Sequence, residues 1–317
     1  MSTAVTTPRH VLRVADLSAE ELTAVLDLAA RMKADPAGWT DALPGLALAA
    51  LFEKPSTRTR ASLAVAAHRL GMLPLTLRPD ELQLGRGETV ADSARVLSGY
   101  AAAIAVRTFA QATLEELAAH AQVPVINALS DDHHPCQALA DLLTVRERFG
   151  TLHGIKLAYL GDGNNVAHSL LEAGALTGLS IAVASPPGYE PDDEVLDRAF
   201  HLQADHGGFL EVTHDPAHAV AGAHAVYTDV WVSMGEDAER DTRLAALTRY
   251  RVTRSLMALA EPQAIFLHCL PAHRGEEVDA AVIDGPWSAV WQQAANRLPT
   301  EQALIYALIT GDWEGSA

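Results

Sequence analysis

The sequence is short of cysteine, of positive charge and of long apolar runs. Its two cysteines, Cys136 and Cys269, cannot form a disulfide framework, and this usage is typical of a reducing cytosol. No apolar run is long enough to span a bilayer, and the first residues lack the apolar core of a signal peptide. Only 23 Lys and Arg stand against 40 Asp and Glu, a formal net charge of −17, which argues against nucleic acid as a partner. We therefore expect a cytoplasmic enzyme with no membrane contact.

The composition is that of a folded protein with more than one core. Hydrophobic residues make up 49% of the chain and charged residues 20%, which excludes a disordered protein. A length of 317 residues is enough for two domains. The first helix is predicted to begin after Ser18, which can form a capping box with Glu21.

Apolar runs typical of buried strands alternate with stretches of helical periodicity. Strands are predicted over 46–52, 73–77, 101–106 and 125–128, with helices over 57–70, 90–97, 114–121 and 135–148. After a break at 150–154, strands are predicted over 156–160, 180–184, 225–228 and 264–267, with helices over 166–176, 193–205, 240–250 and about 289–309. We expect Pro299 to kink or break the last of these helices.

This alternation predicts an α/β fold with two doubly wound parallel-sheet domains, residues 1–150 and 151–296. Each domain should bind its ligand at the carboxyl ends of its strands.

A strand-to-helix turn near the start of the chain carries the strongest chemical signal. Residues 56–60 read Ser-Thr-Arg-Thr-Arg, directly after a predicted strand. The free N–H groups of a helix N-terminus, hydroxyl donors and the planar fork of Arg58 together favour phosphate. The competing interpretation is a capped helix with solvated arginines.

Two His- and Cys-containing segments permit other chemistry. They are 133–137, His-His-Pro-Cys-Gln, and 268–271, His-Cys-Leu-Pro. We reject zinc because no Cys-x-x-Cys pair is present and because His268 and Cys269, as neighbours on a strand, should point to opposite faces. A Cys nucleophile with a His base stays possible, although a buried inert thiol is more common.

Two further strand ends are candidate ligand sites. Residues 160–165, Leu-Gly-Asp-Gly-Asn-Asn, lack the third glycine and the later acidic residue of a dinucleotide site, so NAD is disfavoured and no cofactor is expected. Residues 228–235, Thr-Asp-Val-Trp-Val-Ser-Met-Gly, place Asp229 where it could hold an amine or cap a loop.

Taken together, these segments resemble the aspartate/ornithine carbamoyltransferase family, over nearly the whole chain and in the family's order. Ser-Thr-Arg-Thr-Arg and His-Pro-Cys-Gln mark the family, and Asp-Val-Trp-Val-Ser-Met-Gly and His-Cys-Leu-Pro point to its ornithine branch. The resemblance implies carbamoyl transfer from carbamoyl phosphate to the δ-amine of L-ornithine, giving L-citrulline and phosphate in arginine metabolism. It also implies a homotrimer with active sites between subunits, and a C-terminal helix, about 297–317, that crosses back to the first domain.

The resemblance also implies residue roles. Phosphate would be bound by Ser56, Thr57, Arg58, Thr59, Arg107 and Arg297, with Gln83 reaching in from a neighbouring subunit. The carbamoyl group would be held by His134 and Gln137, near Cys269 and the Leu270 carbonyl. The amino acid would be bound by Asn165, Asp229, Ser233 and Met234. The catalytic set would be Arg107, His134, Asp229, Cys269 and Arg297, with no metal.

Four departures from the family pattern leave other acceptors open: Pro55, Thr108 with Phe109, Ala295 and Pro299. The alternatives are the same transfer to acetylornithine, putrescine or lysine, or a non-catalytic paralogue. Carbamoyl phosphate already carries a good leaving group, so the reaction needs positioning and charge stabilisation and no covalent intermediate. The leaving phosphate can accept the proton of the amine, so no dedicated general base is required.

Overall fold

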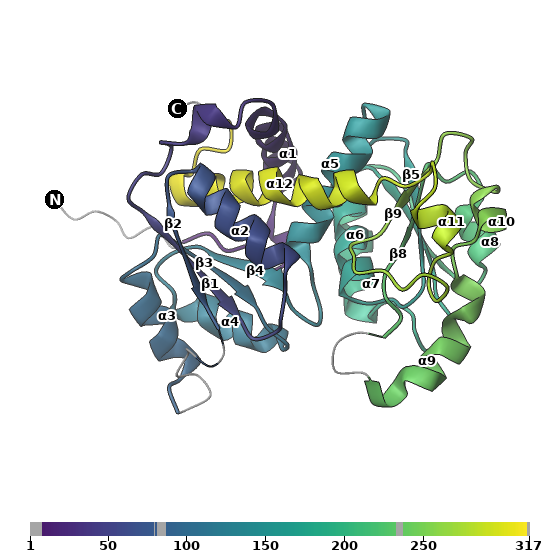
Figure 1. Ribbon diagram of the computed structural model, residues 1–317, viewed down its shortest axis with the longest axis horizontal. Coiled ribbons are helices and arrows are strands. Elements are labelled where there is room, and N and C mark those ends of the chain that lie inside the picture. Colours follow the sequence, from purple (N-terminus) through teal and green to yellow (C-terminus); the bar gives the residue numbers. More distant parts are fainter. Residues whose placement is uncertain (1–7, 79, 81–86, 233–236, 316–317) are drawn as a thin grey trace. The chain divides into compact units, whose positions relative to one another are not determined.

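The structure is a computed structural model that describes residues 8–78, 80, 87–232 and 237–315 (Figure 1). The chain divides into two compact units: unit 1 comprises residues 1–136 and 297–317, and unit 2 comprises residues 137–296. The C-terminal segment therefore belongs to the same unit as the N-terminal half, as the resemblance implied. The predicted boundary near residue 150 stays a prediction.

Unit 1 is built on a four-stranded parallel sheet. Its strands are β1 (Ala47–Phe52), β2 (Leu73–Leu77), β3 (Ala103–Arg107) and β4 (Val125–Leu129), in the spatial order β2-β1-β3-β4. The chain winds outward from the centre in both directions, so the order reverses between β1 and β3. In doubly wound sheets ligands bind at such a reversal, beyond the carboxyl ends of the strands.

Helices cover both faces of this sheet (Figure 1). They are α1 (Ala19–Ala34), α2 (Arg58–Arg69), α3 (Val90–Ser98) and α4 (Gln111–His120). Apolar residues of α3 and α4 share one buried cluster with alternate residues of β1 and β3, while α2 contacts β1 and β2. The predicted capping box of α1 is confirmed, because Glu21 N donates to Ser18 Oγ at 3.1 Å and Ser18 N donates to Glu21 Oε2 at 2.8 Å.

Unit 2 is built on a five-stranded parallel sheet. Its strands are β5 (Lys156–Leu160), β6 (Ser180–Ala184), β7 (Leu210–Thr213), β8 (Ala225–Thr228) and β9 (Ile265–Leu267), in the order β7-β6-β5-β8-β9. Here the winding direction reverses between β5 and β8. The fold class predicted from the sequence is thus confirmed.

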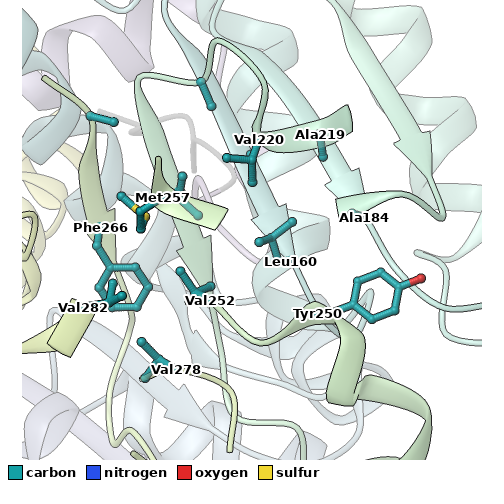
Figure 2. Packing of buried hydrophobic residues seen from close by; sticks show 14 of the residues in the cluster. Leu160, Ala184, Ala219, Val220, Tyr250, Val252, Met257, Phe266, Val278 and Val282 are labelled. Carbon is teal, nitrogen blue, oxygen red and sulfur yellow. The ribbon is translucent and has the colours of Figure 1, made fainter. Parts of the chain in front are cut away.

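The helices of unit 2 also lie on both faces of their sheet. They are α6 (Asn165–Thr177), α7 (Asp193–Gln203), α8 (Pro216–Val220), α9 (Arg240–Leu247), α10 (Arg254–Met257) and α11 (Ala280–Ile283). One face packs Leu160, Ala184 and Phe266 against apolar residues of α8, α10 and α11 (Figure 2). On the other face, α6 approaches β6 closely: a Cβ on Gly174 would lie 2.5 Å from Ile181 Cγ1.

Two long helices continue through the sequence positions where the units divide. They are α5 (Pro135–Phe149) and α12 (Val290–Thr310). The prediction for Pro299 was a kink or a break: the break is wrong, because α12 is continuous and contains Pro299, and the kink stays a prediction. A proline removes one backbone hydrogen bond, and the buried residues that follow it, such as Leu304 and Ile305, compensate by packing.

The remaining differences from the sequence prediction are short elements. Strand β7 and helices α8, α10 and α11 were not predicted, and the predicted helix 240–250 ends at Leu247 and continues as a 3₁₀ turn. In the described ranges, the 3₁₀ helices are Val14–Asp16, Ala37–Trp39, Asp237–Glu239 and Thr248–Tyr250. Among the described residues, no helix combines the length and apolarity needed to cross a membrane.

Candidate active site

Polar residues follow the strands on either side of both reversals. In unit 1, β1 leads to the turn 53–57 and β3 ends at Arg107, whose backbone pairs with Phe52. In unit 2, β5 leads to the turn 161–164 and β8 leads to Asp229. The predicted residues of these four segments therefore lie at the edges where parallel sheets bind ligands.

The turn before α2 is the predicted phosphate cradle. Thr57 is the N-cap residue of α2, and Ser56 Oγ accepts from Thr59 N at 3.3 Å. Arg58 is exposed, whereas Thr59 is buried and its Oγ1 accepts from Arg297 Nη2 at 3.3 Å. A helix N-terminus with adjacent hydroxyls and guanidiniums is a site for a phosphate group.

His134 lies in a cationic environment immediately before α5. Burial lowers its pKa well below 6.5, and the guanidiniums of Arg297, Arg107 and Arg58 lower this pKa further, in that order. The imidazole is therefore neutral at physiological pH and carries one N–H. Three guanidiniums acting on one buried ring repel one another, and a bound anion would relieve that repulsion.

Arg297 is held in place from its own helix. Its Nε and Nη2 donate to Glu301 Oε1 at 3.0 and 2.6 Å, and both side chains are buried. Burial raises the pKa of Glu301, while Arg297 opposes that shift. This pair fixes the guanidinium beside Thr59, where a flexible arginine would lose side-chain entropy on binding a ligand.

The departure at Thr108 and Phe109 has a structural explanation that the sequence did not reveal. Thr108 donates its hydroxyl to Glu53, and the Phe109 ring lies 4.2 Å from Lys54 Nζ, which also pairs with Asp131. A buried lysine beside a ring and a carboxylate stabilises the turn that leads into the cradle. Lys54 is thus a supporting residue that the sequence analysis missed.

Asp229 is the centre of a hydrogen-bond network in unit 2. Its Oδ1 accepts from Val230 N at 2.7 Å and from Cys269 Sγ at 2.8 Å, and its Oδ2 accepts from Asn164 Nδ2 at 3.0 Å. Asp229 is only 8% exposed. Three donors surround this buried side chain, and a carboxylate is a suitable partner for an ammonium ligand.

The segment after β9 corrects one argument made from the sequence. Strand β9 ends at Leu267, so His268 and Cys269 lie in the turn and do not follow strand alternation. One ligand atom of each lies within 4.8 Å of the other and of Asp229. The thiol donates to Asp229 Oδ1, a carboxylate partner that the Cys–His hypothesis did not anticipate.

His268 is already engaged through both ring nitrogens. Its Nδ1 accepts from Leu270 N at 2.8 Å, and its Nε2 lies 3.2 Å from Glu277 Oε1. These bonds orient the turn that carries Cys269 and the Leu270 carbonyl. A metal would have to displace them, and the expectation of no metal stays a prediction.

Gln137 and Cys136 lie in the first turn of α5 and differ in chemistry. Gln137 Nε2 donates to Asp141 Oδ1 at 2.7 Å, and its Oε1 is an acceptor by chemistry. Burial raises the pKa of the Cys136 thiol to about 12, so this cysteine is not a nucleophile.

The remaining predicted residues fall into two groups. Asn165 begins α6, next to its N-cap residue Asn164, which the sequence analysis did not select. A signal was available, because an Asn that ends a glycine turn and starts a helix is an N-cap candidate. Gln83, Ser233 and Met234 lie outside the described residues.

The fold and site define a class: a two-unit parallel α/β protein with a strand end rich in guanidiniums in one unit and a carboxylate-centred strand end in the other. Comparison with known proteins narrows the class. Residues 9–147 match the family model "Aspartate/ornithine carbamoyltransferase, carbamoyl-P binding domain", and residues 153–308 match "Aspartate/ornithine carbamoyltransferase, Asp/Orn binding domain". The chain belongs to the aspartate/ornithine carbamoyltransferase family.

Individual relatives are similar over almost their full length. The chain is 54% identical over 306 residues to the ornithine carbamoyltransferase of Parafrankia sp. (strain EAN1pec), covering 96% of both chains. It is 53% identical to that of Acidothermus cellulolyticus, covering 95% of this chain and 96% of the relative. The solved ornithine carbamoyltransferase from Pyrococcus furiosus superposes with a TM-score of 0.92 at 48% identity, covering 98% of this chain and 99% of that one.

Proposed function

We propose that the protein transfers the carbamoyl group of carbamoyl phosphate to the δ-amine of L-ornithine, giving L-citrulline and phosphate. The observation that carries the proposal is the neutral, buried His134 under the influence of three guanidiniums at the phosphate-type helix terminus of unit 1. Support for ornithine as acceptor comes from the relatives named ornithine carbamoyltransferase. Two of them are 54% and 53% identical to this chain and cover 96% and 95% of it.

In this proposal the phosphate is bound by the start of α2 and by arginines. The ligands are Ser56, Thr57, Arg58, Thr59, Arg107 and Arg297. Negative charge develops on the phosphate as the bond to the carbamoyl carbon breaks, and fixed cations stabilise that charge in the transition state. The neutral His134 donates its N–H to the carbamoyl oxygen, and Gln137 Oε1 accepts from the carbamoyl nitrogen.

The amino-acid half-site has the complementary chemistry. Asp229 binds the α-ammonium of the substrate, and Asn165 binds its α-carboxylate. Cys269 and the Leu270 carbonyl lie by the reacting amine. By resemblance alone, Ser233 and Met234 complete the amino-acid site and Gln83 completes the phosphate site.

The chemical step needs a neutral nucleophile. The δ-amine of ornithine resembles a lysine amine, with an ordinary pKa near 10.4, so only a small fraction is neutral at pH 7. That fraction attacks the carbamoyl carbon, the C–O bond to phosphate breaks, and phosphate takes up the proton released by the amine. No residue has to act as general base, and the protein contributes positioning and charge stabilisation.

A product assay tests the proposal. Purified protein with carbamoyl phosphate should convert ornithine to citrulline, measured as colour with a ureido-specific reagent and confirmed by mass spectrometry. If acetylornithine, putrescine or lysine reacts as fast as ornithine, the assignment of ornithine as the acceptor is wrong. If no amine gives a product, the protein is a non-catalytic paralogue.

We also propose that the active form is a homotrimer with Gln83 donated between subunits. Sedimentation equilibrium should give three times the chain mass of 33.7 kDa. A fully active monomer would exclude the shared site.

A further inference from the structure

Asn164 has a carboxamide whose orientation is determined by its contacts. Its Oδ1 accepts from Val166 N at 3.0 Å and from Ala167 N at 3.3 Å, as the N-cap residue of α6. The same oxygen accepts from Tyr159 Oη at 3.1 Å. Because three donors surround the oxygen, the amide cannot be flipped without losing all three bonds.

Tyr159 is a dependable donor in this arrangement. It is fully buried on β5, and burial, followed by the charges of Asp229 and Asp162, raises the pKa of its hydroxyl well above 10. The phenol is therefore protonated at any pH at which the protein would be assayed. Its hydrogen bond adds a third donor to the Asn164 oxygen, from β5.

The other end of the Asn164 amide determines how Asp229 is presented. Oδ1 of Asp229 accepts from Val230 N and Cys269 Sγ; within the described part of the chain, Oδ2 receives a single bond, from Asn164 Nδ2. A carboxylate has about four acceptor positions, two on each oxygen. One position on Oδ2 is therefore left for a further donor, such as a substrate ammonium.

We propose that Asn164 is a positioning residue of the amino-acid site. It orients the Asp229 carboxylate so that one Oδ2 lone pair receives the α-ammonium of the substrate, and it caps the helix that begins with Asn165. One residue thereby sets the spacing between the proposed ligands of the α-ammonium and the α-carboxylate. This inference rests on the proposed function, in which Asp229 binds the amine.

The test variant is Asn164→Asp, which keeps the shape and the helix cap, since Asp is as good an N-cap residue as Asn. It replaces the donor to Asp229 with a second carboxylate. At pH 8.5 the two carboxylates repel, and kcat/KM for ornithine should fall about 100-fold, mainly through KM. The Ki of L-2-aminopentanoate, which has the α-groups but no δ-amine, should rise by a similar factor, while KM for carbamoyl phosphate stays within twofold.

The pH dependence separates positioning from a general structural defect. Two carboxylates at hydrogen-bond distance bind one shared proton more readily than an isolated carboxylate, and that proton restores a donor between them. Among the described residues, the other titratable groups facing Asp229 are His268, Cys269, Tyr159 and Tyr227. The ratio of wild-type to variant kcat/KM should therefore decrease about tenfold from pH 8.5 to pH 6.5.

Two matched variants complete the design. Asn164→Ser keeps a helix cap, but its side chain is too short to reach Asp229. Its kcat/KM for ornithine should be lower than that of wild type at every pH, with no recovery at low pH. This variant also tests the inference if Asn164→Asp fails to fold. The control is Asp192→Asn, the opposite exchange at the N-cap of α7, where the Asp192 side chain accepts from Glu194 N at 2.8 Å. This variant should leave kcat/KM for ornithine within twofold of wild type.

The outcomes distinguish this inference from the proposed function. If wild-type protein makes citrulline but Asn164→Asp and Asn164→Ser match it, or if kcat falls with Ki unchanged, the positioning role is wrong and the function stands. If wild-type protein makes no citrulline, the proposed function fails and the inference falls with it.

Discussion

At the strand ends of unit 1 three guanidiniums act on a neutral imidazole, whereas at those of unit 2 three hydrogen-bond donors surround one carboxylate. The first arrangement gathers positive charge that a bound anion would offset. The second is nearly satisfied without a ligand. The difference predicts that substitutions in unit 1 act mainly on ligand binding and rate, and that substitutions around Asp229 alter the geometry of the site itself.

The largest expected effect is that of removing one guanidinium from the strand ends of unit 1. Arg58→Ala should lower kcat/KM by about 100-fold or more, corresponding to roughly 3 kcal/mol of transition-state stabilisation. The neighbouring exposed Arg60 provides the matched control, and Arg60→Ala should stay within threefold of wild type. Steady-state kinetics with varied carbamoyl phosphate measures both.

Thermal unfolding sharpens the same comparison. Because Arg58 is exposed and adds to the repulsion, Arg58→Ala should not lower the melting temperature of the ligand-free protein. Carbamoyl phosphate should raise the melting temperature of wild type more than that of the variant, since only bound ligand stabilises the fold. Unchanged kinetics, or equal ligand-induced shifts, would remove Arg58 from the phosphate site.

Mixing two inactive variants tests whether a neighbouring subunit contributes Gln83 to the phosphate site of unit 1. Arg58→Ala and Gln83→Ala subunits, dissociated, mixed in equal amounts and reassembled, should regain roughly a quarter of wild-type activity. Each site takes residue 58 from one subunit and residue 83 from its neighbour. In a random equal mixture about half of the subunits supply an intact Arg58 and half an intact Gln83, so about a quarter of the sites are complete. Hybrids that stay as inactive as their parents would contradict a shared site.

A smaller effect should appear in stability against pH. The pKa of His134 is lowered in the folded protein, so the unfolded chain takes up a proton more readily and acid favours unfolding. The contribution of neutral His134 to the free energy of unfolding is complete above pH 6.5 and is lost as the pH falls below that value. Wild type should therefore lose stability faster than His134→Gln, by up to about 1.4 kcal/mol per pH unit. Urea unfolding at pH 7, 6 and 5.5 measures the difference. Parallel curves would mean that His134 is not held neutral.

The smallest effect distinguishes the two cysteines. Cys136 is buried in unit 1 with its thiol pKa raised to about 12, whereas Cys269 in unit 2 is partly exposed. Iodoacetamide should modify one thiol per folded chain, identified by peptide mass spectrometry as Cys269, and both thiols in urea. Rapid modification of Cys136 in the folded protein would contradict its burial.

The sequence predicted the parts of this molecule that depend on local patterns. Long strands and helices follow apolar periodicity, and the cap at Ser18 follows a local motif, so both were predictable. Strand β7 was missed because a half-buried edge strand containing Glu211 has little periodicity. The continuity of α12 through Pro299 depends on tertiary packing, which no local pattern shows.

The site was predictable in its residue types but not in its connections. The cradle at 56–59 and the position of Asp229 followed from strand ends and helix starts. The contact between Lys54 and Phe109 joins residues far apart in the sequence, and the link between Asn164 and Asp229 spans two strands. The opposite-face argument for His268 and Cys269 failed because it extended strand alternation past residue 267, where both the predicted strand and β9 end.

The measurement that tests the central claim most directly is kcat/KM for ornithine, acetylornithine, putrescine and aspartate at saturating carbamoyl phosphate between pH 6 and pH 8. A site that pairs the α-ammonium with Asp229 and the α-carboxylate with Asn165 should reject amines that leave either group unpaired. Ornithine should exceed the other three by about two orders of magnitude or more, with kcat/KM rising about tenfold per pH unit as the δ-amine loses its proton. Putrescine or acetylornithine matching ornithine, or a flat pH profile, would contradict the account.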